Sequence, residues 1–203
     1  TCLSVSGNFC VDKKPSWLNI IEGRGIKAWA EVTVDARVLS SVLKTTASAV
    51  YETWMAKCMM GSIMSGSMGF NAHIANVIAA MFLATGQDLG HVGEGSVGIT
   101  TCEITHTSDV KDASHIGGEN ELLYVSVYLP DLMVGTVGGG TGLATQREAL
   151  SILGVSGGND GKNSQRLAEI IAGAVLAGEI SLLASEAEGS LAEAHQKLAR
   201  GKE

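Results

Sequence analysis

The chain has 203 residues, 45% of them hydrophobic, which is enough to bury a core and form one large domain. Its net charge of −7 comes with no compensating basic stripe, which argues against nucleic-acid binding. Its four cysteines have no CxxC spacing, so the sequence predicts neither a zinc site nor a disulfide framework and fits a reducing compartment. We expect no signal peptide and no membrane-spanning apolar run, and the start at Thr1 rather than methionine suggests a piece of a longer protein.

The first motif in the chain is residues 6–15, SGNFCVDKKP. Adjacent lysines repel each other, so a folded protein that keeps both of them beside a carboxylate usually uses them to hold an anion. Asp12 can pair closely with only one of them. Pro15 disfavours helix at Lys14, so we expect Lys13 and Lys14 on an extended loop where they can point apart. A solvated charged turn is the alternative interpretation.

The regular elements follow from the spacing of apolar residues. In chain order the sequence predicts a half-buried strand, two helices and two antiparallel strands, over residues 27–34, 37–54, 71–85, 98–106 and 121–129. Gly86 ends the second helix, and a polar loop joins the last two strands. An apolar stripe predicts a long helix over residues 165–187, in which Arg166, Glu169 and Glu179 exclude a membrane span.

Several polar residues near these elements have two interpretations each. Lys57 precedes the glycine-rich run of residues 61–69, which is unlike a regular helix throughout, and a lone lysine is more often solvated than functional. His73 and Asn76 lie three residues apart on one face of the second helix, where they either satisfy the local backbone or face a site. Asp88 follows the unfavourable end of that helix dipole, so it is either solvated or kept there to pair with a cation such as Lys13.

Other histidines have no such pattern. His91, His106 and His115 make no ligand spacing with a carboxylate or thiol, so the sequence assigns them no chemistry and predicts no metal site. His195 lies on a last short helix, after Gly189 and a capping-box pattern at residues 190–193, where a histidine is usually exposed.

A second motif is GTVGGGT, residues 135–141, between a strand and a helix at 149–153. Three consecutive glycines let the backbone approach a flat ring or a pyrophosphate with its amide donors exposed. The motif is not GxGxxG, so on residues alone nucleotide binding is one interpretation among others. The entry of the helix, residues 145–148, has a capping-box pattern.

Four segments in the same order, SGNFCVDKKP, NAHIAN, GQD and GTVGGGT, resemble motifs of eukaryotic-type 3-hydroxy-3-methylglutaryl-CoA reductase, and the resemblance runs from about Ser6 to about His195. It implies an α/β (α+β) fold, the large substrate-binding domain, with helices and antiparallel sheet segments around a central helix. Residues 1–15 would be the loop that joins the small cofactor subdomain to the large domain. Residues 16–203 would be the C-terminal part of the large catalytic domain, with the upstream catalytic portion and the membrane anchor absent.

The resemblance also implies the chemistry, the reduction of HMG-CoA to mevalonate and CoA with NADPH as the cofactor. Lys13 would stabilise the oxyanion, Asp88 would tune that lysine, and His195 would be the acid for the departing thiolate. Substrate-binding roles fall on Ser6, Asn8, Asp12, Lys14, Lys57, His73 and Asn76. Cofactor-binding roles fall on Val137, Gly138, Gly139, Gly140 and Thr141. A cis peptide at Cys10–Val11 is also implied.

The same resemblance implies a homo-oligomer, a dimer of dimers with active sites between subunits. The full-length protein would sit in the endoplasmic reticulum membrane through an upstream region, with its catalytic domain in the cytosol. Because the catalytic glutamate of the family would lie upstream of Thr1, we expect this chain alone to be inactive. Two alternatives remain: a non-catalytic CoA- or thioester-binding and oligomerisation module that keeps the fold, and an unrelated nucleotide-binding α/β protein.

Overall fold

The computed structural model describes residues 1–8, 10–106 and 121–189, and its centre is a three-stranded antiparallel sheet. The strands are β1 (Ile26–Val34), β2 (Ile99–His106) and β3 (Glu121–Leu132), in the order β1-β3-β2. The strand and pairing predictions are confirmed, although β3 runs to Leu132, three residues further than predicted. In β3, Leu123, Val125 and Val127 are fully buried and alternate with half-buried residues, because only one face of this sheet is covered.

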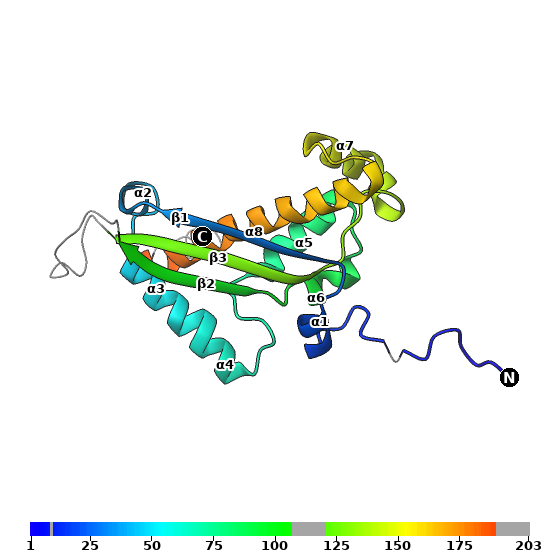
Figure 1. Ribbon diagram of the computed structural model, residues 1–203, viewed down its shortest axis with the longest axis horizontal. Helices are drawn as coiled ribbons and strands as arrows, with labels where there is room; N and C mark the ends of the chain where they lie inside the picture. The colour runs from blue at the N-terminus through cyan, green and yellow to red at the C-terminus, as the bar shows by residue number, and fades with distance from the viewer. Residues whose placement is uncertain (9, 107–120, 190–203) are drawn as a thin grey trace, which may run out of the picture.

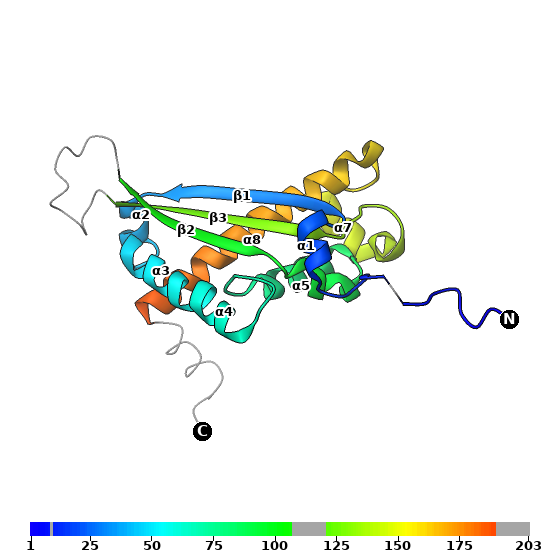
Figure 2. The same cartoon turned by 60° about the horizontal axis from the view of Figure 1, so that its bottom comes forward.

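Helix α8 (Lys162–Glu188) is the central helix that was expected, and it crosses the covered face of the sheet (Figure 1). Its stripe of Leu167, Ile171, Val175 and Leu183 is fully buried. Helices α3 (Ala47–Trp54) and α5 (Ile74–Thr85) flank it on the same side (Figure 2). By length and composition α8 could cross a membrane, but half of its most apolar stretch is buried inside the domain, as in the core helix of a folded protein.

The predicted single helix over 37–54 is wrong, because the chain turns within it. The structure has α2 (Ala36–Ser41) and α3, separated by a turn in which Lys44 has a left-handed φ of 57°. Thr46 then caps α3 by accepting from the backbone N–H of Ala49. Helical structure continues through the π-helix η1 (Met55–Gly61) and α4 (Ser62–Ser65), and ends at the left-handed Gly66.

The remaining elements are short. They are α1 (Trp17–Glu22), η2 (Leu89–His91), α6 (Val92–Gly95), η3 (Gly139–Gly142), α7 (Ala144–Ile152) and η4 (Asn159–Gly161). The capping box predicted at residues 145–148 is wrong, because α7 already begins at Ala144 and its N-cap, Leu143, has no side-chain cap. The second predicted capping box, at residues 190–193, lies outside the described residues.

The other face of the sheet carries an exposed aromatic side chain, Trp29, beside a half-buried one, Tyr128. Trp29 of β1 and Tyr128 of β3 are directly paired, and their rings stack with centroids 4.8 Å apart. No described helix covers them, and α3, α5 and α8 all lie on the opposite side (Figure 2). The N-terminal segment runs away from the body of the domain (Figure 1).

Candidate functional site

The segments GQD (residues 86–88) and GTVGGGT (residues 135–141) meet at the C-terminal end of α5. The amide of Gln87 joins them by a reciprocal pair: its Nε2 donates to the carbonyl of Gly135 at 2.9 Å, and the N–H of Gly135 donates to its Oε1 at 2.8 Å. Gly86 and Gly140 touch through their backbones. A Cβ on Gly86 would lie 2.4 Å from the carbonyl oxygen of Gly140, and a Cβ on Gly140 would lie 2.6 Å from that of Gly86. Neither position can carry a side chain without displacing the other motif.

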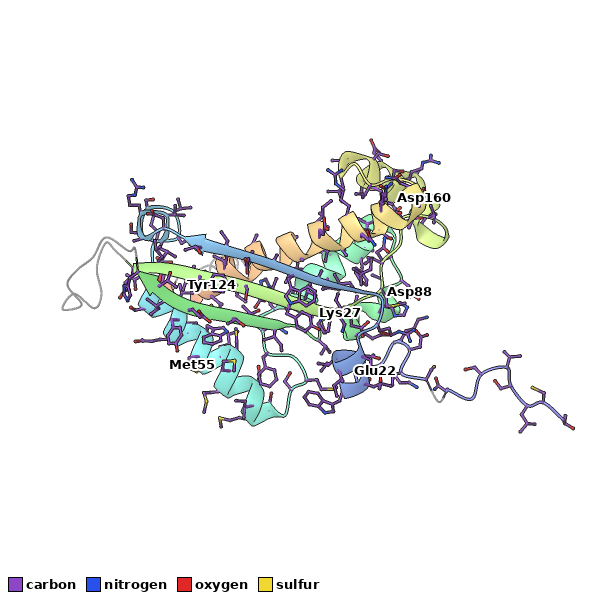
Figure 3. The ribbon with its side chains drawn as sticks, in the orientation of Figure 1. Glu22, Lys27, Met55, Asp88, Tyr124 and Asp160 are labelled. Carbon is purple, nitrogen blue, oxygen red and sulfur yellow. The ribbon has the colours of Figure 1, made fainter. Side chains whose placement is uncertain are left out.

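A cavity of about 530 Å³ opens where these motifs meet. Its wall includes Gln87, Asp88 and His91 together with residues 137–141. The five residues predicted to bind a cofactor therefore lie together and line the same cavity as Asp88. Asp88 is at the end of the molecule from which the N-terminal segment extends (Figure 3).

Lys13 reaches Asp88, in the wall of this cavity, from the N-terminal loop. Its Nζ lies 2.9 Å from Oδ2 of Asp88, and the two side chains are 47% and 54% exposed. The hydrogen bond and then the charge of Asp88 raise the pKa of Lys13. The hydrogen bond from Lys13, followed by that from the backbone N–H of Gly90, lowers the pKa of Asp88. Both groups are therefore held in their charged forms, and the structure brings together the pair that the sequence suggested.

The rest of the N-terminal motif is arranged differently from the expectation. Asp12 forms an ion pair with Arg24 and not with a lysine. Lys14 folds back on its own loop, donating to the carbonyls of Asn8 at 3.2 Å and Cys10 at 3.5 Å. The hydroxyl of Ser6 accepts from the N–H of Asn8 at 3.3 Å.

Within the described part of the chain, no hydrogen bond or ion pair links Ser6, Asn8 or Lys14 to Asp88. The structure therefore leaves these three predicted substrate ligands on the exposed N-terminal segment. The Cys10–Val11 peptide bond is trans, so the expectation of a cis bond is wrong for this structure.

A second cavity, of about 480 Å³, has Pro15 and Gly93 in its wall. Two predicted substrate ligands line it, Lys57 and His73, and its wall otherwise holds small and polar residues such as Ser62 and Ser67. Lys57 forms an ion pair with Glu186 of α8. Asn76 is exposed on α5 and is not part of the wall.

Glu179, in the middle of α8, positions His73. This fully buried carboxylate accepts from the backbone N–H groups of Ala72 at 2.8 Å and His73 at 2.7 Å, and from the hydroxyl of Thr100 at 2.6 Å. It therefore caps the start of α5 from a distant helix, where the helix dipole favours a negative charge. The sequence analysis used Glu179 only to exclude a membrane span; a lone acid on the apolar stripe of a core helix was the signal for this role.

The ring of His73 is also oriented. Its Nε2 lies 2.8 Å from the carbonyl oxygen of Gly178, which can only accept, so Nε2 carries a proton. In the neutral ring Nδ1 is then an acceptor, ready for a hydroxyl or amide donor of a ligand.

One predicted catalytic residue, His195, lies outside the described residues. Conversely, His91, to which the sequence assigned no chemistry, lies against Asp88 and Asp12, with Nε2 3.8 Å and 4.0 Å from their carboxylate oxygens. The missed signal was the spacing of His91 and Glu94, three residues apart at the start of one helix, which places them on one face.

The fold and the site define an α+β domain in which a lysine–carboxylate pair lies beside a cavity that is lined by glycine-rich backbone. A cation held by a carboxylate beside a cavity is a kind of arrangement that enzymes use to stabilise developing negative charge. The chain belongs to the hydroxymethylglutaryl-coenzyme A reductase family, because the model of that family matches residues 1–200.

Named relatives support this assignment. The chain is 50% identical over 200 residues to a 3-hydroxy-3-methylglutaryl-coenzyme A reductase of Pyrococcus abyssi, covering 98% of this chain and 46% of the relative. It is 51% identical over 199 residues to that of Methanothermobacter thermautotrophicus, with the same coverage. It is 45% identical over 202 residues to reductase 1 of Arabidopsis thaliana, covering 98% of this chain and 32% of the relative. The chain thus spans about half the length of the archaeal relatives, which are at least as similar to it as the plant enzyme.

Proposed function

We propose that this chain is the C-terminal part of the catalytic domain of an NADPH-dependent reductase that converts HMG-CoA to mevalonate and CoA. The observation that carries the proposal is the Lys13–Asp88 pair, 2.9 Å apart, at the rim of the cavity lined by residues 137–141. Family membership supports the reaction, and this geometry supports the roles of the residues.

Each reduction step builds negative charge on a carbonyl oxygen. The ammonium of Lys13 would stabilise that charge, and Asp88 keeps the lysine protonated and fixed in place. NADPH, when bound, supplies the hydride, and the residues that fit its nicotinamide end are Val137, Gly138, Gly139, Gly140 and Thr141, whose backbone lines the cavity. His195 would protonate the departing thiolate.

The second cavity fits the acyl part of the substrate. Lys57 would hold the terminal carboxylate after exchanging its present partner, Glu186. His73, with Nδ1 free to accept, fits a hydroxyl or amide of the ligand. The proposed ligand set is completed by Asp12, Asn76, Ser6, Asn8 and Lys14. The last three would reach the ligand after the N-terminal segment folds over the site.

The division into parts is also a proposal. Residues 1–15 would connect to a small cofactor subdomain, and residues 16–203 would belong to the large domain, because the archaeal relatives are about twice as long as this chain. The upstream part would supply a catalytic glutamate, and a dimer of dimers would place active sites between subunits. Only a parent protein of the eukaryotic type would have a membrane anchor and be located in the endoplasmic reticulum.

A test compares the complete enzyme with two variants, Lys13→Ala and Lys14→Ala. Steady oxidation of NADPH that depends on HMG-CoA, with mevalonate as the product, is expected. Lys13→Ala should lower kcat by about 10²–10³-fold, as for other single oxyanion donors. Lys14→Ala should mainly raise KM for HMG-CoA. HMG-CoA binding without any NADPH oxidation by the complete protein would favour a non-catalytic CoA- or thioester-binding module.

A further inference from the structure

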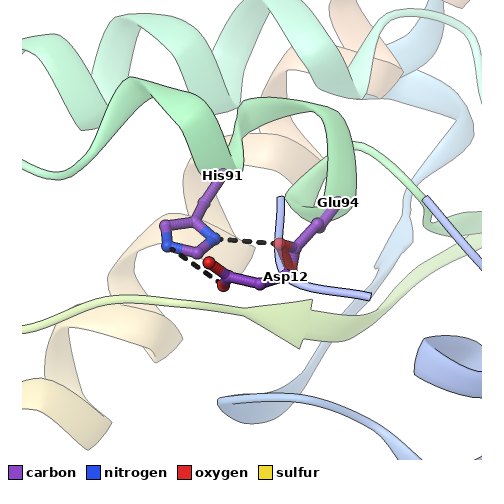
Figure 4. A group of neighbouring side chains, drawn as sticks. All are labelled: Asp12, His91 and Glu94. Carbon is purple, nitrogen blue, oxygen red and sulfur yellow. Dashed lines mark hydrogen bonds and ion pairs between the residues drawn. The ribbon is translucent and has the colours of Figure 1, made fainter. Parts of the chain in front are cut away.

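Beside the Lys13–Asp88 pair lies a cluster of ionisable groups, of which the proposed mechanism uses only Asp12. Figure 4 shows three of them, Asp12, His91 and Glu94. Nδ1 of His91 lies 2.9 Å from Oε1 of Glu94, and since a carboxylate only accepts, Nδ1 carries the proton. The opposite nitrogen, Nε2, faces Asp88 and Asp12. The imidazole therefore stands between a fully buried carboxylate and the carboxylate that pairs with Lys13.

Glu94 binds the N-terminal loop as well. Its carboxylate accepts the backbone N–H of Lys13, in addition to Nδ1 of His91. Lys13 has a left-handed φ of 58°, a strained backbone conformation for a residue with a Cβ. The contact with Glu94 holds that conformation, so one buried carboxylate fixes both the backbone of Lys13 and the ring that faces its partner.

The charges of the cluster are arranged to keep Glu94 in place. Nε of Arg24 lies 3.4 Å from Oε2 of Glu94, and the same guanidinium pairs with Asp12. Asp131 of β3 is buried nearby, and within the described residues neither of its oxygens has a hydrogen-bond partner. Burial, followed by the charge of Glu94, raises the pKa of Asp131 to about 7, so the negative charge near Glu94 is reduced by a proton on Asp131 at and below neutral pH.

The ligand atoms of Asp12, His91 and Glu94 lie within 4.8 Å of one another, a spacing that a divalent cation could use. The guanidinium of Arg24, however, already lies between the two carboxylates and supplies their positive partner. The cluster therefore has its own cation, and its contacts point toward Lys13 and Asp88 rather than toward a metal.

We propose that His91 and Glu94 are positioning residues for the reaction: Glu94 fixes the Lys13 backbone, and His91, held by Glu94, packs its imidazole against the carboxylate of Asp88. This inference rests on the proposed function. Both residues act through the Lys13–Asp88 pair. Removing them should therefore change turnover more than substrate binding.

The kinetic test uses the complete enzyme with His91→Phe and His91→Gln. Phenylalanine fills the space without the hydrogen bond to Glu94, whereas glutamine keeps a donor. We expect His91→Phe to lower kcat by about 10–100-fold, since misplacement of a catalytic group by 1 Å can cost about 10²-fold, with KM for HMG-CoA within about two-fold. His91→Gln should recover most of kcat. His106→Phe, on an exposed strand end, is the matched control.

Two kinetic outcomes would overturn the inference. One is a wild-type kcat in His91→Phe. The other is a fall in kcat that His91→Gln does not recover and that is fully explained by a loss of folded protein in urea unfolding. A second readout does not depend on activity. In the chain itself, Glu94→Gln should speed hydrogen exchange of the Lys13 amide about 10-fold, because a charge-assisted bond is replaced by a weaker neutral one. An unchanged exchange rate would refute the Glu94 contact. If the wild-type enzyme reduces nothing while this exchange result holds, the proposed function fails and the contact stands.

Discussion

The backbone contact between Gly86 and Gly140 joins the two motifs of the candidate site, and four alanine substitutions can measure it. Gly86 has a left-handed backbone, φ 72° and ψ 31°, and its Cβ would clash with Gly140. Gly66 ends α4 with nearly the same backbone, φ 66° and ψ 28°, but has nothing within 4 Å of an added Cβ. Gly140 has the clash without the positive φ, and Gly142 has neither.

The magnitudes follow from these two costs. A left-handed alanine costs about 1–2 kcal/mol, so Gly66→Ala should lower the free energy of unfolding by that amount. Crowding a packed contact costs about 1–3 kcal/mol, which is the expectation for Gly140→Ala. Gly86→Ala has both costs and should lower the free energy of unfolding by about 2–5 kcal/mol. Gly142→Ala has neither cost and should be neutral, or more stable by less than about 1 kcal/mol.

The assay is urea unfolding of the four variants and the wild type, followed by fluorescence of the three tryptophans. In the complete enzyme, Gly86→Ala and Gly140→Ala should also weaken NADPH binding, whereas Gly66→Ala should not. Equal losses for Gly86→Ala and Gly66→Ala would refute the close contact, because only the backbone strain would then remain.

The other predictions concern buried carboxylates and the chain alone. The raised pKa of Asp131 means that the folded state binds more protons than the unfolded state between about pH 4 and pH 7, so this group lowers the free energy of unfolding as pH rises through that window. Asp131→Asn should remove that fall in a pH series of urea unfolding, and an unchanged slope would contradict the raised pKa. Glu179→Ala should destabilise the protein by about 3 kcal/mol or more in the same assay, because the N–H groups of Ala72 and His73 lose their buried acceptor; a loss below about 1 kcal/mol would show that water replaces it. The purified 203-residue chain should show no NADPH oxidation dependent on HMG-CoA, since loss of a general acid alone costs about 10²–10⁴-fold; steady turnover would contradict the proposed division of the site.

The sequence predicted the strands, the central helix and the pairing of Lys13 with Asp88, because periodicity and local motifs carry that information. It missed the break between α2 and α3, since Lys44 turns the chain there without the glycine or proline that normally marks a turn.

The buried carboxylates that position the site residues were harder to predict for a different reason. Glu94 contacts a residue 81 positions away, and Glu179 contacts residues more than 100 positions away. Only the fold brings such partners together, so the sequence could show unusual buried acids but not what they bind. The spacing of His91 and Glu94 was the local exception.

The most direct test of the account is a double-mutant cycle of Lys13→Ala and Asp88→Asn on kcat for HMG-CoA reduction by the complete enzyme. Since the two groups form one charged pair, each single variant should disable it and the double variant should be little worse than either, with a coupling of about 0.5–3 kcal/mol. Losses that simply add would show that Lys13 and Asp88 act independently, and would contradict the assignment of Asp88.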